Sequence, residues 1–171
     1  RAWMALATSV ALMLGWAIRP QSSNDLVVTF LDVGHGGAVL FQFPGGTTAL
    51  FDAGSFGRGE AAEETIHRAL EARRIASLNA LILSHADSDH YNAAAGLARR
   101  LPIGVLYVSQ AFPDLSQWSI AEMLDSVSRH EIPIRLLQAG DFFDPSATCR
   151  MEVLHPAGGF RDRLDNAHSI V

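Results

Sequence analysis

The sequence predicts a mixed α/β domain, one half of a sandwich in which helices cover two packed β-sheets. Three observations lead to this fold class. Short apolar runs bounded by turn residues alternate with longer amphipathic stretches along the chain. Three strands joined by short links come first and predict a meander. A polar cluster then follows a buried strand, which is where open α/β sheets place their chemistry.

The meander is predicted between residues 26 and 51. Residues 26–31 are rich in β-branched side chains and predict a strand that is buried on both faces. Residues 38–43 and 48–51 predict two further strands, with Pro-Gly-Gly-Thr at 44–47 as the hairpin turn between them. The third strand ends at Asp52.

The later elements alternate between helix and strand. Residues 60–74 predict a helix with an apolar stripe and with Arg73 and Arg74 in its last turn, where they favour the helix dipole. His67 falls on its polar side, so we expect a solvated side chain. Further helices are predicted at 93–101 and 116–130, and further strands at 78–83, 103–108, 134–137, 141–143 and 151–154.

Two histidines and two aspartates fall within six residues directly after the strand at 78–83. In an extended segment His85 and Asp87 project to the same side, because side chains alternate with period two. Asp89 and His90 can then address a second position, so one loop can hold two cations a few Å apart. Imidazole and carboxylate together suit Zn, Mn or Fe. The alternative is a polar surface loop with aspartates as helix caps.

This stretch resembles the signature H-x-[HD]-x-D-H of the metallo-β-lactamase fold. Residues 31–38, Leu-Asp-Val-Gly-His-Gly-Gly-Ala, resemble the opening strand of ComEC-type competence proteins, which take DNA into bacteria. Residues 50–54 resemble the strand-end D-[TA]-G of the fold, and residues 166–171 resemble a later N-x-x-S-[IVL]-V strand. The resemblance therefore implies a metallo-β-lactamase-like domain over residues 26–171, the first half of an αββα sandwich.

The resemblance also implies a site that holds two divalent metal ions, Mn or Zn. One ion would be held by His85 and Asp87, and the other by Asp89 and His90. Asp89 would in addition be the catalytic residue that orients the attacking water. Asp87 stands where many relatives have a second histidine, and this harder ligand favours Mn²⁺ over Zn²⁺.

Three residues outside the cluster are implied to support these ligands through hydrogen bonds: Asp52, Asp32 and His35. Two positions depart from the family pattern. His35 stands where many relatives carry Gln, and Gly37 stands where many carry Asp. If that Asp assists the chemistry in relatives, its role has no counterpart in this chain.

The implied function is a metal-dependent DNase domain of a bacterial competence DNA-uptake channel. Two alternatives remain: a hydrolase of a lactone, thioester or small phosphodiester on the same fold, and a non-catalytic structural module of the channel. The later metal motifs of the fold have no counterpart here. We therefore expect a domain that is truncated at its C-terminus and that is inactive as a fragment. Its expected partner is the remainder of the same channel protein.

Composition bears on the substrate. The net charge is −5, and all 13 basic residues are arginines. This is not the basic balance of a nucleic-acid-binding protein, and it counts against DNA as the substrate, although two bound cations would add positive charge locally.

The single cysteine, Cys149, allows no internal disulfide and falls on a predicted strand.

The first 19 residues differ in kind from the rest. Residues 2–18 are almost wholly apolar, with tryptophans near both ends, which favours the end of a transmembrane helix. A secretory signal and a buried helix are the alternatives. Residues 20–25 form a polar linker. The resemblance implies a bacterial plasma-membrane protein whose soluble domain lies on the extracytoplasmic side.

Overall fold

The computed structural model describes residues 24–110, 112, 118–159 and 169–171, and its centre is a six-stranded sheet. The strands lie side by side in chain order. The first three are antiparallel, and the last three run parallel to the third. They are β1 (Val27–Phe30), β2 (Val39–Gln42), β3 (Thr48–Phe51), β4 (Ala80–Leu83), β5 (Leu106–Ser109) and β6 (Ile134–Leu137).

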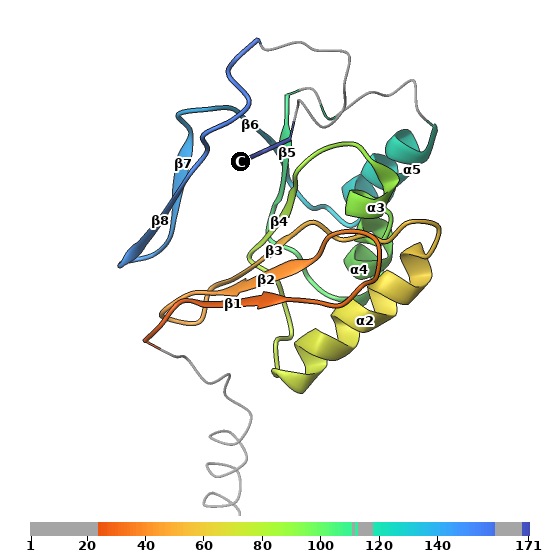
Figure 1. The fold of residues 1–171 in the computed structure, drawn as a ribbon, viewed down its shortest axis with the longest axis horizontal. Helices are drawn as coiled ribbons and strands as arrows, with labels where there is room; N and C mark the ends of the chain where they lie inside the picture. Colours follow the sequence, from red (N-terminus) through yellow and green to blue (C-terminus); the bar gives the residue numbers. More distant parts are fainter. Residues whose placement is uncertain (1–23, 111, 113–117, 160–168) are drawn as a thin grey trace, which may run out of the picture.

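Two different layers cover the two faces of this sheet (Figure 1). On one side lie the helices α2 (Gly59–Ala72), α3 (Ser88–Tyr91), α4 (Ala94–Arg100) and α5 (Trp118–Arg129). On the other side lies an antiparallel hairpin, β7 (Phe142–Ser146) and β8 (Cys149–Glu152). The predicted mixed α/β class and the antiparallel meander are confirmed, and the arrangement is consistent with part of an αββα sandwich.

No helix within the described ranges is long and apolar enough to cross a membrane. The transmembrane helix predicted at residues 2–18 lies outside those ranges.

The larger core lies between the sheet and the helices. Alternate residues of β4 point to opposite faces, so Leu81 and Leu83 join this core while Ile82 packs on the hairpin side. The hairpin-side core is small and includes Ile170 from the C-terminal segment. The Ile170 N–H donates to the Ser84 carbonyl at 2.8 Å, so this segment is tied to the end of β4.

The prediction that the first strand is buried on both faces is wrong. β1 is an edge strand, and its side chains are largely open to solvent, with Phe30 79% exposed. A run of β-branched residues predicts a strand equally well at the centre or the edge of a sheet, because periodicity does not report how many neighbours a strand has.

Two helix boundaries also differ from prediction. The segment from Ser88 to Tyr91 is one turn of helix rather than loop, so Asp89 and His90 are helical residues. The preceding Asp87 is extended, with ψ 137°. The helix predicted to reach residue 74 ends at Ala72, because the chain turns into a left-handed conformation at Arg74, with φ 57°.

Helices α2 and α4 are joined by an ion pair between a buried glutamate and an exposed arginine. Glu63 is 9% exposed, and its Oε1 lies 2.6 Å from Arg100 Nε. Gly96 of α4 makes room for this carboxylate, since a Cβ built there would lie 1.6 Å from Glu63 Oε2. Glycine is an unfavourable residue inside a helix, and here any larger residue would displace the Glu63 carboxylate from its ion pair with Arg100.

We therefore expect Gly96→Ala to destabilise the protein by about 1–2 kcal/mol, because overpacking outweighs the gain in helix propensity. Thermal or urea unfolding measures this. The double variant Glu63→Ala/Gly96→Ala should recover part of the loss, since the clashing carboxylate is gone. A stabilised Gly96→Ala protein would contradict the proposed reason for the glycine.

Candidate metal centre

The candidate site lies where two neighbouring parallel strands end. β3 and β4 pair with Phe51 opposite Ile82, so Asp52 and the residues after Leu83 leave the sheet at the same edge. The Asp52 N–H donates to the Ile82 carbonyl at 2.8 Å. The sheet therefore brings together two segments that are more than thirty residues apart in the chain.

Asp52 is the central hydrogen-bond acceptor of this site. Asp52 is only 5% exposed to solvent. Its backbone is left-handed, with φ 59°, and this conformation turns the carboxylate toward the end of β4. Oδ1 accepts the Ser84 N–H at 2.7 Å, and Oδ2 accepts the Ser84 hydroxyl at 2.9 Å. Oδ2 also lies 2.7 Å from His90 Nδ1. One buried carboxylate thus orients both Ser84 and His90.

These hydrogen bonds determine which nitrogen of each imidazole carries its proton. Because the Ser84 hydroxyl donates its only hydrogen to Asp52, it must accept from His85 Nδ1, which lies 2.8 Å away. His90 likewise donates its Nδ1–H to Asp52. In its neutral form, each imidazole therefore presents an Nε2 lone pair, which is the arrangement of metal-binding histidines.

Each Nε2 atom faces a carboxylate oxygen. His85 Nε2 lies 3.2 Å from Asp87 Oδ2, and His90 Nε2 lies 3.9 Å from Asp89 Oδ2. Asp87 occupies the N-cap position of α3 but makes no side-chain cap hydrogen bond, which argues against the surface-loop alternative. Two lone pairs at 3.2 Å repel unless a proton or a cation lies between them. Two ligands of one tetrahedral zinc ion stand about 3.3 Å apart, so this donor set fits a divalent cation.

The four side chains meet as two pairs rather than at one point. The His85 and His90 rings lie beside each other, with centroids 4.1 Å apart. However, the described residues contain no group of three or more His, Cys, Asp or Glu side chains that could hold a metal ion. Since a tetrahedral cation takes four ligands, each pair supplies two of them.

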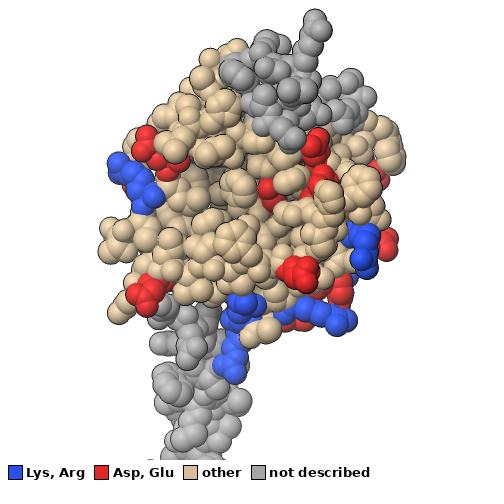
Figure 2. All heavy atoms as spheres, in the orientation of Figure 1, with Lys and Arg blue, Asp and Glu red and all other residues tan. Residues whose placement is uncertain are grey.

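The surroundings of the pairs are acidic. The pKa of His90 is raised above its ordinary value, first by the hydrogen bond to Asp52, and further by the charges of Asp52, Asp89 and Asp87, although burial opposes the shift. In Figure 2 acidic side chains gather around the end of β4, whereas the arginines in view lie at the margins of this face. Such a field attracts cations to the site.

The three residues implied to support the ligands differ in how closely they approach them. Asp52 makes the contacts described above. His35 Nε2 lies 3.9 Å from Asp89 Oδ2, and the His35 side chain is 84% exposed. The carboxylate of Asp32 is exposed and accepts the Gly34 N–H at 3.3 Å. Gly37 adjoins the site, since a Cβ there would lie 3.1 Å from both Asp52 Oδ2 and His90 Nδ1.

The sequence reasoning missed two residues of this site. Ser84 directly precedes the motif, and a hydroxyl next to a metal-binding histidine was the available signal. Asn92 follows the motif at the C-cap of α3, and its side chain accepts the Ser55 N–H at 3.1 Å and donates to the Ser55 carbonyl at 2.7 Å. Asn92 therefore ties the loop after β3 to the helix that carries Asp89 and His90.

Replacing Ser84 with alanine is expected to weaken divalent-metal binding about 10-fold, because His85 loses the partner that fixes its tautomer. Isothermal titration with Mn²⁺ and Zn²⁺ measures the effect. Ser128→Ala, a change at an exposed position of α5, is the matched control. Equal metal affinity of the Ser84 variant and the wild type would contradict the role of this hydroxyl.

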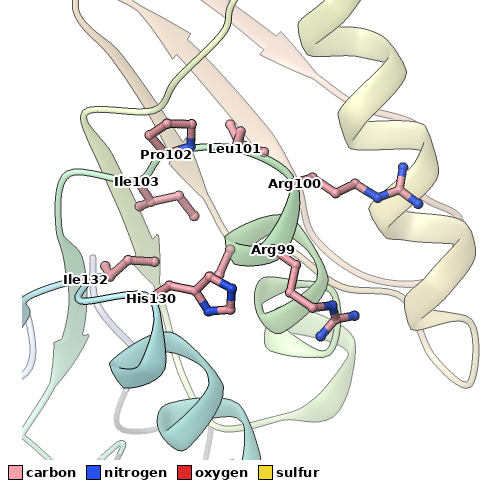
Figure 3. A pocket seen from close by; sticks show the side chains of 8 residues that line it. Arg99, Arg100, Leu101, Pro102, Ile103, His130 and Ile132 are labelled. Carbon is pink, nitrogen blue, oxygen red and sulfur yellow. The ribbon is translucent and has the colours of Figure 1, made fainter.

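A separate hollow of about 390 Å³ lies where α4 ends and the chain turns toward β5 (Figure 3). It is lined by Arg99, Arg100, His130 and apolar side chains. These residues precede β5 and β6, so the hollow lies at the amino ends of the parallel strands. The candidate metal site lies at their carboxyl ends, and the hollow is not part of it.

A sequence model of the family described as "Metallo-beta-lactamase superfamily" matches residues 31–159. The matched range contains β2 and β3 of the meander, the His-Asp cluster and every residue discussed for the site, and it begins directly after β1. No curated protein matches the chain.

Proposed function

This chain belongs to the metallo-β-lactamase superfamily, and from that premise we propose that it hydrolyses phosphodiester bonds of DNA with the help of divalent cations. The superfamily carries a hydrolase fold. The metal, the substrate and the cellular role are the parts that we propose.

One observation carries the proposal: two imidazole Nε2 lone pairs face carboxylate oxygens at the end of β4. Divalent cations held by His85 with Asp87, and by Asp89 with His90, would supply Lewis acidity and lower the pKa of a bound water. Asp52 and Ser84 hold both imidazoles in the tautomer that such binding needs. Asp89, with a side chain that is 18% exposed, would orient the attacking water.

The donor set favours phosphate chemistry over the alternatives. With Asp87 in place of a second histidine, the two pairs hold as many carboxylates as imidazoles, which is harder than a histidine-rich set. Hard cations such as Mn²⁺ pair well with phosphate oxygens. This supports a phosphodiester over a thioester, whose sulfur is soft.

The choice of DNA, and of a membrane-bound uptake channel, rests on sequence resemblance. Residues 31–38 resemble the opening strand of ComEC-type proteins, and the apolar residues 2–18 suit a membrane anchor. We therefore place the domain on the extracytoplasmic side of a bacterial plasma membrane, where it would degrade one strand of incoming DNA.

The test is a cleavage assay on the protein expressed from its complete reading frame. Single- and double-stranded DNA are incubated with Mn²⁺, Mg²⁺ or Zn²⁺, beside a lactone and a thioester. We expect cleavage of DNA, strongest with Mn²⁺. Hydrolysis of the lactone or thioester alone would favour another hydrolase of the same fold. No turnover of any substrate would favour a structural module.

A further inference from the structure

Two exposed rings border the candidate metal site. Phe56 lies in the loop between β3 and α2 and is 69% exposed. His35 lies in the loop between β1 and β2, and its side chain is 84% exposed. The two ring centroids are 5.8 Å apart, with an angle of 45° between the planes.

Hydrogen bonds hold the two loops that carry these rings together. The Phe56 N–H donates to the His35 carbonyl at 2.7 Å, which joins the two loops. The neighbouring Ser55 is held on both its N–H and its carbonyl by the side chain of Asn92, the C-cap residue of α3. The backbones of both loops are thus tied to the end of the short helix that carries Asp89 and His90.

The rings also lie beside the groups that would do the chemistry. His35 Nε2 is 3.9 Å from Asp89 Oδ2, and the same oxygen is 3.9 Å from His90 Nε2. A group resting against His35 and Phe56 would therefore lie next to a phosphate placed at the Asp89–His90 pair.

We propose that Phe56 and His35 form a platform on which one base of single-stranded DNA stacks. This inference rests on the proposed function and names how that site recognises its substrate. The net charge of −5 means that phosphate attraction to the protein's own side chains supplies little affinity. Aromatic stacking supplies affinity without positive charge and accepts every base, provided that the base is unpaired.

The test compares two single-stranded hexanucleotides with cleavage-resistant phosphorothioate linkages, one carrying 2-aminopurine and one abasic at the same position. Binding is measured with Mg²⁺ by anisotropy, and stacking is measured by quenching of 2-aminopurine fluorescence. We expect Phe56→Ala to abolish the quenching and to weaken binding of the base-bearing strand on the order of 10- to 100-fold, the worth of one stacked base. Binding of the abasic strand should not change.

Two further variants sharpen the comparison. Phe56→Trp retains a flat ring and should retain the quenching. Phe142→Ala removes another exposed phenylalanine, 58% exposed on the hairpin, and should bind both strands as the wild type does. Equal weakening of the base-bearing and abasic strands by Phe56→Ala, or no weakening of either, would overturn the platform.

The platform and the proposed function fail in different ways. A wild-type protein that quenches 2-aminopurine but cleaves no DNA with any metal would retain the platform and refute the nuclease. A protein that cleaves DNA, and for which Phe56→Ala changes neither quenching nor binding, would retain the nuclease and refute the platform.

Discussion

Asp89→Asn is expected to lower turnover of a phosphodiester substrate on the order of 10²-fold or more, with the fold intact. The substitution removes one negative charge and one strong donor oxygen from the pair with His90. It changes no packing contact, because asparagine has the same shape. The Asp89 carbonyl, which accepts the Gly37 N–H at 3.1 Å, is also unaffected. Initial rates with Mn²⁺ measure the effect.

The matched control is Asp144→Asn on the hairpin, where the carboxylate pairs with Arg150 at 2.8 Å and lies outside the site. It should cleave at the wild-type rate. Circular dichroism and the midpoint of thermal unfolding check that both variants are folded. Equal turnover by the Asp89 variant and the wild type would mean that the reaction takes place elsewhere.

Asp52→Asn is expected to weaken metal binding by about 10- to 100-fold, although Asp52 does not face the Nε2 atoms itself. The carboxylate accepts three hydrogen bonds, two from Ser84 and one from His90. An asparagine offers one oxygen and one NH₂ group, so at least one of these donors would face another donor. Asparagine tolerates the left-handed backbone at this position, so the loss would not arise from backbone strain.

The same substitution should lower the free energy of unfolding by about 1.5–3 kcal/mol, the range for hydrogen bonds to a charged group. Titration calorimetry with Mn²⁺ and urea unfolding measure the two effects separately. Asp125→Asn on α5 is the control, because its carboxylate pairs only with Arg129 among the described ion pairs. An Asp52 variant with wild-type metal affinity would show that the buried hydrogen bonds do not position His90 for binding.

Local sequence patterns were sufficient for the order of the elements and for every element except α3, which was predicted as loop. The apolar run before His85 predicted β4, and the stripe of Ile66 and Leu70 predicted α2, because each pattern reflects the period of its own element. Short spacing also sufficed for the pairing of His85 with Asp87. Residues two apart in an extended segment face the same side wherever the segment lies.

Tertiary structure decided what depends on neighbours distant in the chain. Whether a β-branched strand lies at the edge or the centre follows from how many strands flank it, and β1 has one. The sequence showed that Asp52 ends a strand, but only the parallel pairing of β3 with β4 placed its carboxylate against Ser84 and His90.

The same distinction holds for single residues whose role is set across a contact. In the sequence, Gly96 is only a residue that disfavours a helix. The structure shows that Glu63 of another helix packs against it. In the sequence, Ser84 only separates the strand from the motif. The structure shows that its hydroxyl is hydrogen-bonded to both Asp52 and His85. The sequence by itself determined which residues are proposed to bind metal, since that proposal rests on side-chain type and short spacing. The fold determined which atoms those side chains present, since tautomer and orientation depend on partners that folding brings close.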